Sequence, residues 1–228
     1  MSRRACPLVQ MKGASQRACL LVPTVVIAAL IASSGAIAGP GRRLDCLPPH
    51  ATTLAKDREI LVYSLASPTL NQGGTYACRL GRKTKVTLAK PSRYCCHSIE
   101  HVTVVGAIVA YTEGTRGVDS GCAGIVVVDV AHRRTLLTVP DVACYVDAGI
   151  ISFSRLTDFV LSPHGSAAWI VQVGGVRQTA GFEVHSAQVS GVLTLLDQDP
   201  TIVPGSMRLS HGLVSWEDAG RRSSAPLS

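Results

Sequence analysis

A short pattern that recurs four times constrains the fold of this 228-residue chain more than any other feature of its sequence. Each copy consists of an apolar residue, a small or β-branched residue and then an aromatic ring. The intervals between successive rings are 48, 58 and 47 residues, and glycine precedes three of the copies, where a tight turn can start a strand. Self-similarity at this period indicates a stack of similar structural units. The rings are Tyr63, Tyr111, Trp169 and Trp216, and the glycines are Gly106, Gly165 and Gly212.

Hairpins accompany the rings on both sides. A short strand-like run lies ahead of each glycine, and a second pair of such runs follows three of the rings. Two hairpins make four antiparallel strands, and a single four-stranded sheet cannot bury both of its faces. We therefore predict an all-β domain over residues 57–228, a propeller-like stack of about four antiparallel four-stranded sheets. A β-sandwich with repeated hairpins is the alternative.

The repeat makes two further predictions about position. The four rings should occupy equivalent second-strand positions, each on the same face as the residue two places earlier, because side chains alternate along a strand. The last unit contains only about three strands, so the ring of sheets is either open or completed by a strand near 51–54. The residues expected on the ring faces are Leu61, Val109, Ala167 and Val214.

Two local patterns resemble those of known propellers. The segment Val128-Asp129-Val130 and the basic turn after it are similar to the strand and turn of WD-repeat and TolB-type propellers. The segments 165–169 and 205–216 look like those of exported bacterial proteins with propeller-like repeats and no agreed activity. The resemblance covers residues 57–228 and implies a fold without a function. The chain departs from it in the 58-residue interval and in lacking the aromatic residue that often follows the Asp of WD repeats.

The first 38 residues have the pattern of a secretory signal peptide. Four basic residues precede an uncharged apolar stretch at 18–32, and Ala36-Ile37-Ala38 is a small-x-small cleavage site. We predict cleavage between Ala38 and Gly39, a linker at 39–56, and a secreted or extracytoplasmic protein. The alternative is that the uncharged run at 18–39 is retained as an anchor, which would be the chain's one contact with the membrane.

Charge argues against nucleic acid as a partner. The precursor carries 22 basic and 15 acidic residues, but four of the basic residues lie in the leader, so the remainder has a net charge of only +3. No run of Lys or Arg beyond the leader exceeds two residues. Nucleic-acid binding needs clustered positive charge, which this sequence lacks.

Six cysteines follow the leader, an even number that favours disulfides in an exported chain. A hairpin turning near His132 would place Cys122 opposite Cys144, so this pair is predicted to be bonded. The adjacent residues Cys95 and Cys96 are poorly placed to bond to each other, and we expect them to pair with Cys46 and Cys78 in an order that the sequence leaves open.

One motif suggests catalysis. The segment His97-Ser98-Ile99-Glu100-His101 matches H-x-x-E-H, a zinc-protease pattern that requires a helix to bring both histidines to one metal ion. Here the β-branched run 102–105 follows directly, and on a strand His97 and His101 would lie about 13 Å apart. We therefore predict an extended segment that binds no catalytic zinc.

No other catalytic or phosphate-binding motif is present in the sequence. Asp129, Asp147, Asp158 and Asp197 stand at or near strand ends, where turn hydrogen bonds explain them. The sequence thus predicts an exported, non-catalytic domain without a cofactor, which binds a protein or an envelope ligand through its loops. The alternative is an exported hydrolase whose site is assembled only in three dimensions.

Overall fold

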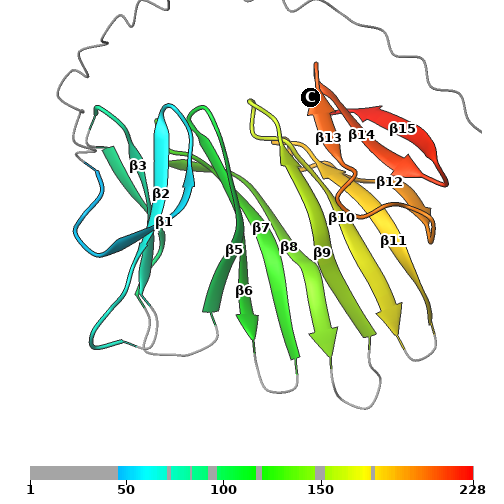
Figure 1. Cartoon of the computed structure of the whole chain (residues 1–228), viewed down its shortest axis with the longest axis horizontal. Helices are drawn as coiled ribbons and strands as arrows, with labels where there is room; N and C mark the ends of the chain where they lie inside the picture. Colours follow the sequence, from blue (N-terminus) through cyan, green and yellow to red (C-terminus); the bar gives the residue numbers. More distant parts are fainter. Residues whose placement is uncertain are drawn as a thin grey trace, which may run out of the picture. The chain divides into compact units, whose positions relative to one another are not determined.

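The computed structural model describes residues 46–70, 73–82, 84–91, 97–116, 120–146, 152–175 and 178–227. The chain divides into two units, 1–41 and 42–228, and all described residues belong to the second. Their regular structure consists of fifteen strands, every adjacent pair of which is antiparallel (Figure 1). The predicted all-β class is confirmed. No helix among the described residues has the length and hydropathy needed to cross a bilayer.

The strands follow one another as successive hairpins. The first sheet has the order β1-β2-β3-β4, the second runs from β5 to β12, and the third is β13-β14-β15. The strands of the first sheet are β1 (Ala51–Lys56), β2 (Ile60–Leu65), β3 (Gly74–Arg79) and β4 (Thr84–Ala89). Those of the second are β5 (His97–Val105), β6 (Ile108–Arg116), β7 (Ser120–Asp129), β8 (Arg134–Val146), β9 (Ser152–Leu161), β10 (Ala167–Gly175), β11 (Gln178–Ala187) and β12 (Leu193–Asp199). Those of the third are β13 (Arg208–Ser210), β14 (Leu213–Asp218) and β15 (Arg221–Pro226).

The eight-stranded sheet consists of two four-stranded halves, β5–β8 and β9–β12. Among the described residues they are joined by two residue pairs, Tyr145 with Phe153 and Val146 with Ser152, at one end of the long strand β8. Residues from both halves nevertheless pack face to face in one apolar core, including Leu137 and Leu161. The chain therefore forms three sheets where the sequence predicts about four, because two of the units stay connected at one end.

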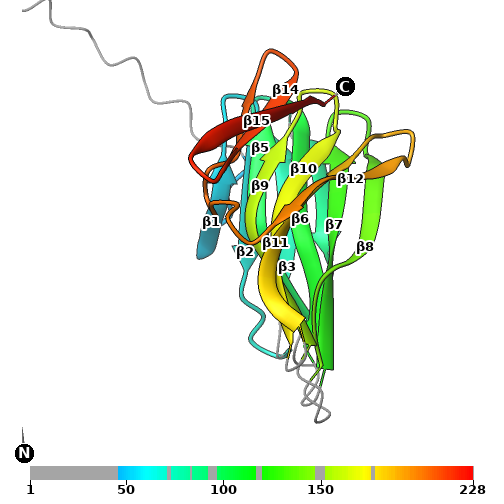
Figure 2. The ribbon, with the colours of Figure 1, turned by 90° about the vertical axis from the view of Figure 1, so that its right-hand side faces the viewer.

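All four rings lie on the second strand of a unit, namely β2, β6, β10 and β14. Each ring shares a core with the residue two positions before it, as the alternation of a strand predicts. Tyr111 packs against residues of the first sheet, Trp169 against the β5–β8 half, and Trp216 against the β9–β12 half. The third sheet also contacts the β9–β12 half through β13 and β9. Figure 2, viewed from the side of the third sheet, shows β14 and β15 in front. Each ring therefore lies on the predicted strand of its hairpin, but Tyr111 and Trp169 belong to one eight-stranded sheet and Trp216 to a three-stranded one. The placement of the rings in successive four-stranded sheets stays a prediction.

Two of the rings donate a hydrogen bond to the last strand of the preceding four, one to a backbone carbonyl and the other to a carboxylate. The Tyr111 hydroxyl donates to the Leu88 carbonyl on β4 at 3.3 Å, and Trp216 Nε1 donates to Asp197 Oδ2 on β12 at 2.7 Å. In both cases a ring on a second strand bonds to the fourth strand of the unit before it. Burial raises the pKa of Tyr111, and the nearby Glu113 charge adds to the effect, so this hydroxyl keeps its proton as a donor.

The outer face of the first sheet is covered by the segment that precedes β1. A disulfide joins Cys46 to Cys78 on β3, beside the buried Tyr63. The prediction that Cys46 and Cys78 pair with Cys95 and Cys96 is therefore wrong, and those two cysteines lie outside the described residues. The physical reason is that residues 46–56 belong to the sheet domain, so Cys46 lies over β3.

The N-terminal boundary of the sheet domain lies earlier in the chain than predicted, because residues before 57 are part of the first sheet. The predicted linker at 39–56 contains β1, which pairs with β2 from Ala51 to Lys56. The sheet domain thus starts before residue 57. The strand near 51–54, considered above as a way to complete the last sheet, belongs to the first one.

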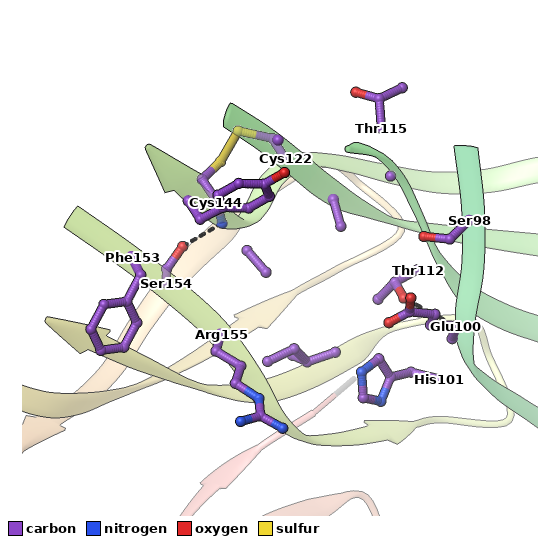
Figure 3. A pocket seen from close by; sticks show the side chains of 16 residues that line it. Ser98, Glu100, His101, Thr112, Thr115, Cys122, Cys144, Phe153, Ser154 and Arg155 are labelled. Carbon is purple, nitrogen blue, oxygen red and sulfur yellow. Dashed lines mark hydrogen bonds between the residues drawn. A yellow bond between two sulfur atoms is a disulfide. The ribbon is translucent and has the colours of Figure 1, made fainter. Parts of the chain in front are cut away.

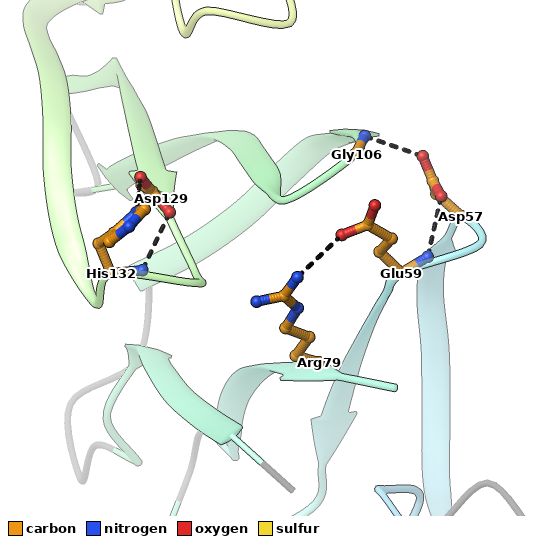
Figure 4. Close-up of polar contacts among 6 residues, drawn as sticks. All are labelled: Asp57, Glu59, Arg79, Gly106, Asp129 and His132. Atoms are coloured by element: carbon orange, nitrogen blue, oxygen red, sulfur yellow. Dashed lines mark hydrogen bonds and ion pairs between the residues drawn. The ribbon is translucent and has the colours of Figure 1, made fainter. Parts of the chain in front are cut away.

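Acidic side chains fix several turns between strands (Figure 4). Asp57, in the turn after β1, accepts a hydrogen bond from the Gly106 amide in the turn after β5 at 2.9 Å. In the turn after β7, Asp129 accepts from the His132 amide at 3.0 Å, and its other oxygen lies 2.7 Å from His132 Nδ1. The turn bond predicted for Asp129 is thus present. Asp158 and Asp197 lie within β9 and β12 and accept hydrogen bonds from the Met207 amide, just before β13, and from Trp216 Nε1 on β14. Asp147 lies outside the described residues.

The Asp129 contact predicts a pH dependence of stability. Burial acts to raise the pKa of Asp129, but hydrogen bonds from the side chain and backbone of His132 outweigh it, so the pKa lies below the ordinary value of 3.8. The contact therefore stabilises the fold above that value, and its contribution is lost as pH falls through the lower folded pKa. We expect Asp129→Asn to lower the free energy of unfolding by about 1 kcal/mol at neutral pH. The loss should be much smaller at about pH 2, where the carboxylate is largely protonated.

Urea unfolding at both pH values measures this difference. The control is Glu217→Gln, which removes one exposed carboxylate from β14. An equal loss for Asp129→Asn at both pH values would contradict the assignment.

Candidate functional site

A cavity of about 540 Å³ lies among five consecutive strands, β5 to β9 (Figure 3). β5 contacts β9 although the two are not hydrogen-bonded neighbours in the sheet order, so the strands between them curve around the cavity, which is open on one side. A volume of this size lies within the range of small-molecule sites in proteins.

The β5 wall is built on an irregularity in the strand. Successive side chains of a regular strand point to opposite faces, yet Glu100 and His101 both line the cavity. The pairing register of β5 with β6 shifts between Glu100 and Thr103, and His101 has a φ of 50°, in the left-handed region. A bulge of this kind re-aims a side chain. The buried Thr112 on β6 supports the bulge by donating its hydroxyl hydrogen to the Glu100 carbonyl at 3.0 Å.

The β9 wall combines a cation with apolar surface. Arg155 and Leu156 both line the cavity, and Leu156 is buried whereas Arg155 is exposed at its edge. Among the described residues, Arg155 has no hydrogen-bond or ion-pair partner. The neighbouring Ser154 accepts a hydrogen bond from the Cys144 amide at 2.7 Å, which fixes β9 against β8.

The Cys122–Cys144 disulfide also lines the cavity. It joins β7 to β8 at paired positions, as the sequence predicts from a hairpin turning near His132. Asp141 lies close to both sulfur atoms, and these three residues have the spacing of a metal site. The sulfur atoms are bonded to each other, however, and the thiolate is the form of Cys that binds metals. We therefore assign this group a structural role.

The H-x-x-E-H segment is extended, as predicted. Residues 97–105 form β5, so the helix that the zinc-protease pattern requires is not present there. The structure brings Glu100 and His101 into the cavity, while the side chain of His97 lies outside the described residues. The absence of catalytic zinc stays a prediction. The predicted cleavage site between Ala38 and Gly39 also lies outside the described residues.

Sequence reasoning missed the other polar residues of the cavity. Thr112, Ser154 and Arg155 come from strands that are distant in sequence, and no local motif surrounds them. A search against protein-family models, curated proteins and solved structures finds no match to this chain. The resemblance to WD-repeat and TolB-type propellers therefore stays a prediction.

Proposed function

We propose that this chain is an exported, non-catalytic binding domain that holds a small ligand in the cavity formed by β5 to β9. The observation that carries the proposal is the bulge in β5, which places the exposed side chains of Glu100 and His101 together in the lining of one open-sided cavity. Bulges and positive φ angles at non-glycine residues are enriched at functional sites, because an unfavourable backbone persists where the surrounding structure holds it. Two disulfides fit an extracytoplasmic location.

We further propose that the domain is a propeller-like stack in which β1–β4, β5–β8, β9–β12 and β13–β15 are successive units. The equivalent placement of the four rings supports this, as do the hydrogen bonds of Tyr111 and Trp216 to the fourth strand of the preceding unit. In this arrangement the cavity lies within the second unit and at its junction with the third. Binding inside the stack replaces the earlier expectation that a partner is held by loops alone.

Ligand-observed NMR with a library of small organic molecules tests the binding proposal. We expect several library members to bind the oxidised chain and to lose binding in Ala143→Phe, which places a ring among the lining residues. Ala66→Phe, at an exposed loop position, is the matched control and should bind as the wild type does. Binding that survives in Ala143→Phe, or a library without binders, would refute a ligand site in this cavity.

A hydrolase is the second candidate, because Glu100 and His101 line the cavity together with Ser98 and Ser154. A carboxylate, an imidazole and a hydroxyl are the side chains that general acid–base and nucleophilic catalysis use. Turnover of an activated ester that disappears in His101→Gln would favour this candidate over the binding proposal.

A further inference from the structure

Arg155 is a cationic side chain in the cavity lining, and it bears on the charge of a ligand that the cavity could hold. Arg155 is a guanidinium, which stays charged at all physiological pH values and presents several donors in one plane. Neither a hydrogen bond nor an ion pair joins it to another described residue. Arg155 is exposed at the edge of the cavity, where an oxyanion can replace water at its donors, and a planar carboxylate matches the guanidinium geometry with two parallel hydrogen bonds.

A second donor lies opposite. His101 projects from the bulge in β5 while Arg155 comes from β9, and both side chains point into the space between these strands (Figure 3). His101 likewise has no partner among the described residues. In either protonation state the imidazole can donate one hydrogen bond, so it can add to the recognition of an anion held by Arg155.

The rest of the lining is suited to an apolar body. Leu156 is 5% exposed, and Ala123, Ala143 and the Cys122–Cys144 disulfide lie on the neighbouring strands. Apolar surface of a ligand placed against these side chains would leave water, which stabilises the complex in proportion to the area buried. Glu100 is on the same wall as His101, and its negative charge disfavours a ligand with more than one anionic group.

We propose that the ligand is an amphipathic organic monoanion, with a carboxylate at Arg155 and an apolar body against Leu156 and the disulfide. This inference rests on the proposed binding function and adds the ligand class to it. It also assigns a reason to the bulge, since a regular β5 would turn either Glu100 or His101 away from the ligand.

Calorimetric titration of the oxidised chain tests the class. The probes are medium-chain and aryl carboxylates, each paired with its primary amide, which has the same shape without the charge. We expect the carboxylates to bind the wild type about tenfold or more tightly than the amides, and Arg155→Gln to remove that difference. Arg155→Lys keeps the positive charge but lacks the planar guanidinium, so it should retain part of the preference for carboxylates over amides. Arg222→Gln on β15 removes the same charge outside the lining and should change nothing.

The outcomes separate the two proposals. Equal binding of carboxylates and amides, or an unchanged preference in Arg155→Gln, would overturn the anionic class and leave the binding function standing. Binding of neither probe class would likewise overturn the proposed ligand class. A library without binders, or binding that persists in both Ala143→Phe and Thr115→Trp, would overturn the binding function itself. Two blocking variants are used so that failure of one to fold leaves the test intact.

Discussion

Replacing Trp169 by alanine is expected to lower the free energy of unfolding by about 3–5 kcal/mol. The indole is 2% exposed and lies in the core shared by the two halves of the eight-stranded sheet. It also stacks on the His185 ring, with centroids 5.6 Å apart and an interplanar angle of 13°. Alanine would leave a cavity between two packed faces, which the joined strands β8 and β9 cannot fully close.

Urea unfolding followed by far-UV circular dichroism measures the effect without relying on indole fluorescence. The control is Leu193→Ala on the edge strand β12. The Leu193 side chain is 57% exposed, so this change should alter the free energy of unfolding by less than about 0.5 kcal/mol. A loss below about 1 kcal/mol for Trp169→Ala would show that this ring does not hold the two halves together.

Removal of the Cys122–Cys144 disulfide should cost about 2–4 kcal/mol, because the bond restricts the unfolded chain over a sequence separation of 22 residues. The double variant Cys122→Ala, Cys144→Ala tests this in the oxidised protein, where the Cys46–Cys78 bond is retained. Part of the loss in stability should also come from the native state, since the bond holds β7 to β8 at the cavity.

Reduction of both proteins with dithiothreitol provides the control for this comparison. Once the wild type has lost the same bond, its stability and that of the double variant should converge. Equal stability of the two proteins before reduction would contradict a stabilising role for the bond.

Much of the fold could be predicted because its signals are local. The rings, the glycines before them and the turn near His132 each act within a few residues, so strand positions and the Cys122–Cys144 pair follow from counting along hairpins. The Cys46–Cys78 pair could not be predicted in the same way. It depends on how the segment before β1 covers the outer face of the first sheet, which is a contact between distant parts of the sequence.

Only part of the candidate site could be predicted from the sequence, because the site also depends on contacts between residues that are distant in sequence. Glu100 and His101 belong to a sequence motif that requires a helix, whereas in the structure they lie on a bulged strand. The bulge arises from the register between β5 and β6, and Arg155 reaches the cavity because β9 contacts β5. Neither the register nor that contact leaves a local pattern that a reader of the sequence could count.

A crystal structure of the oxidised chain with the tightest-binding carboxylate from the panel tests the central claim most directly. The account predicts the carboxylate beside Arg155, its apolar body against Leu156 and the Cys122–Cys144 disulfide, and both Glu100 and His101 facing it. The same structure should show Tyr111, Trp169 and Trp216 each packed on the preceding unit. A ligand held outside β5 to β9, or β8 and β9 paired along their full length without a cavity, would contradict it.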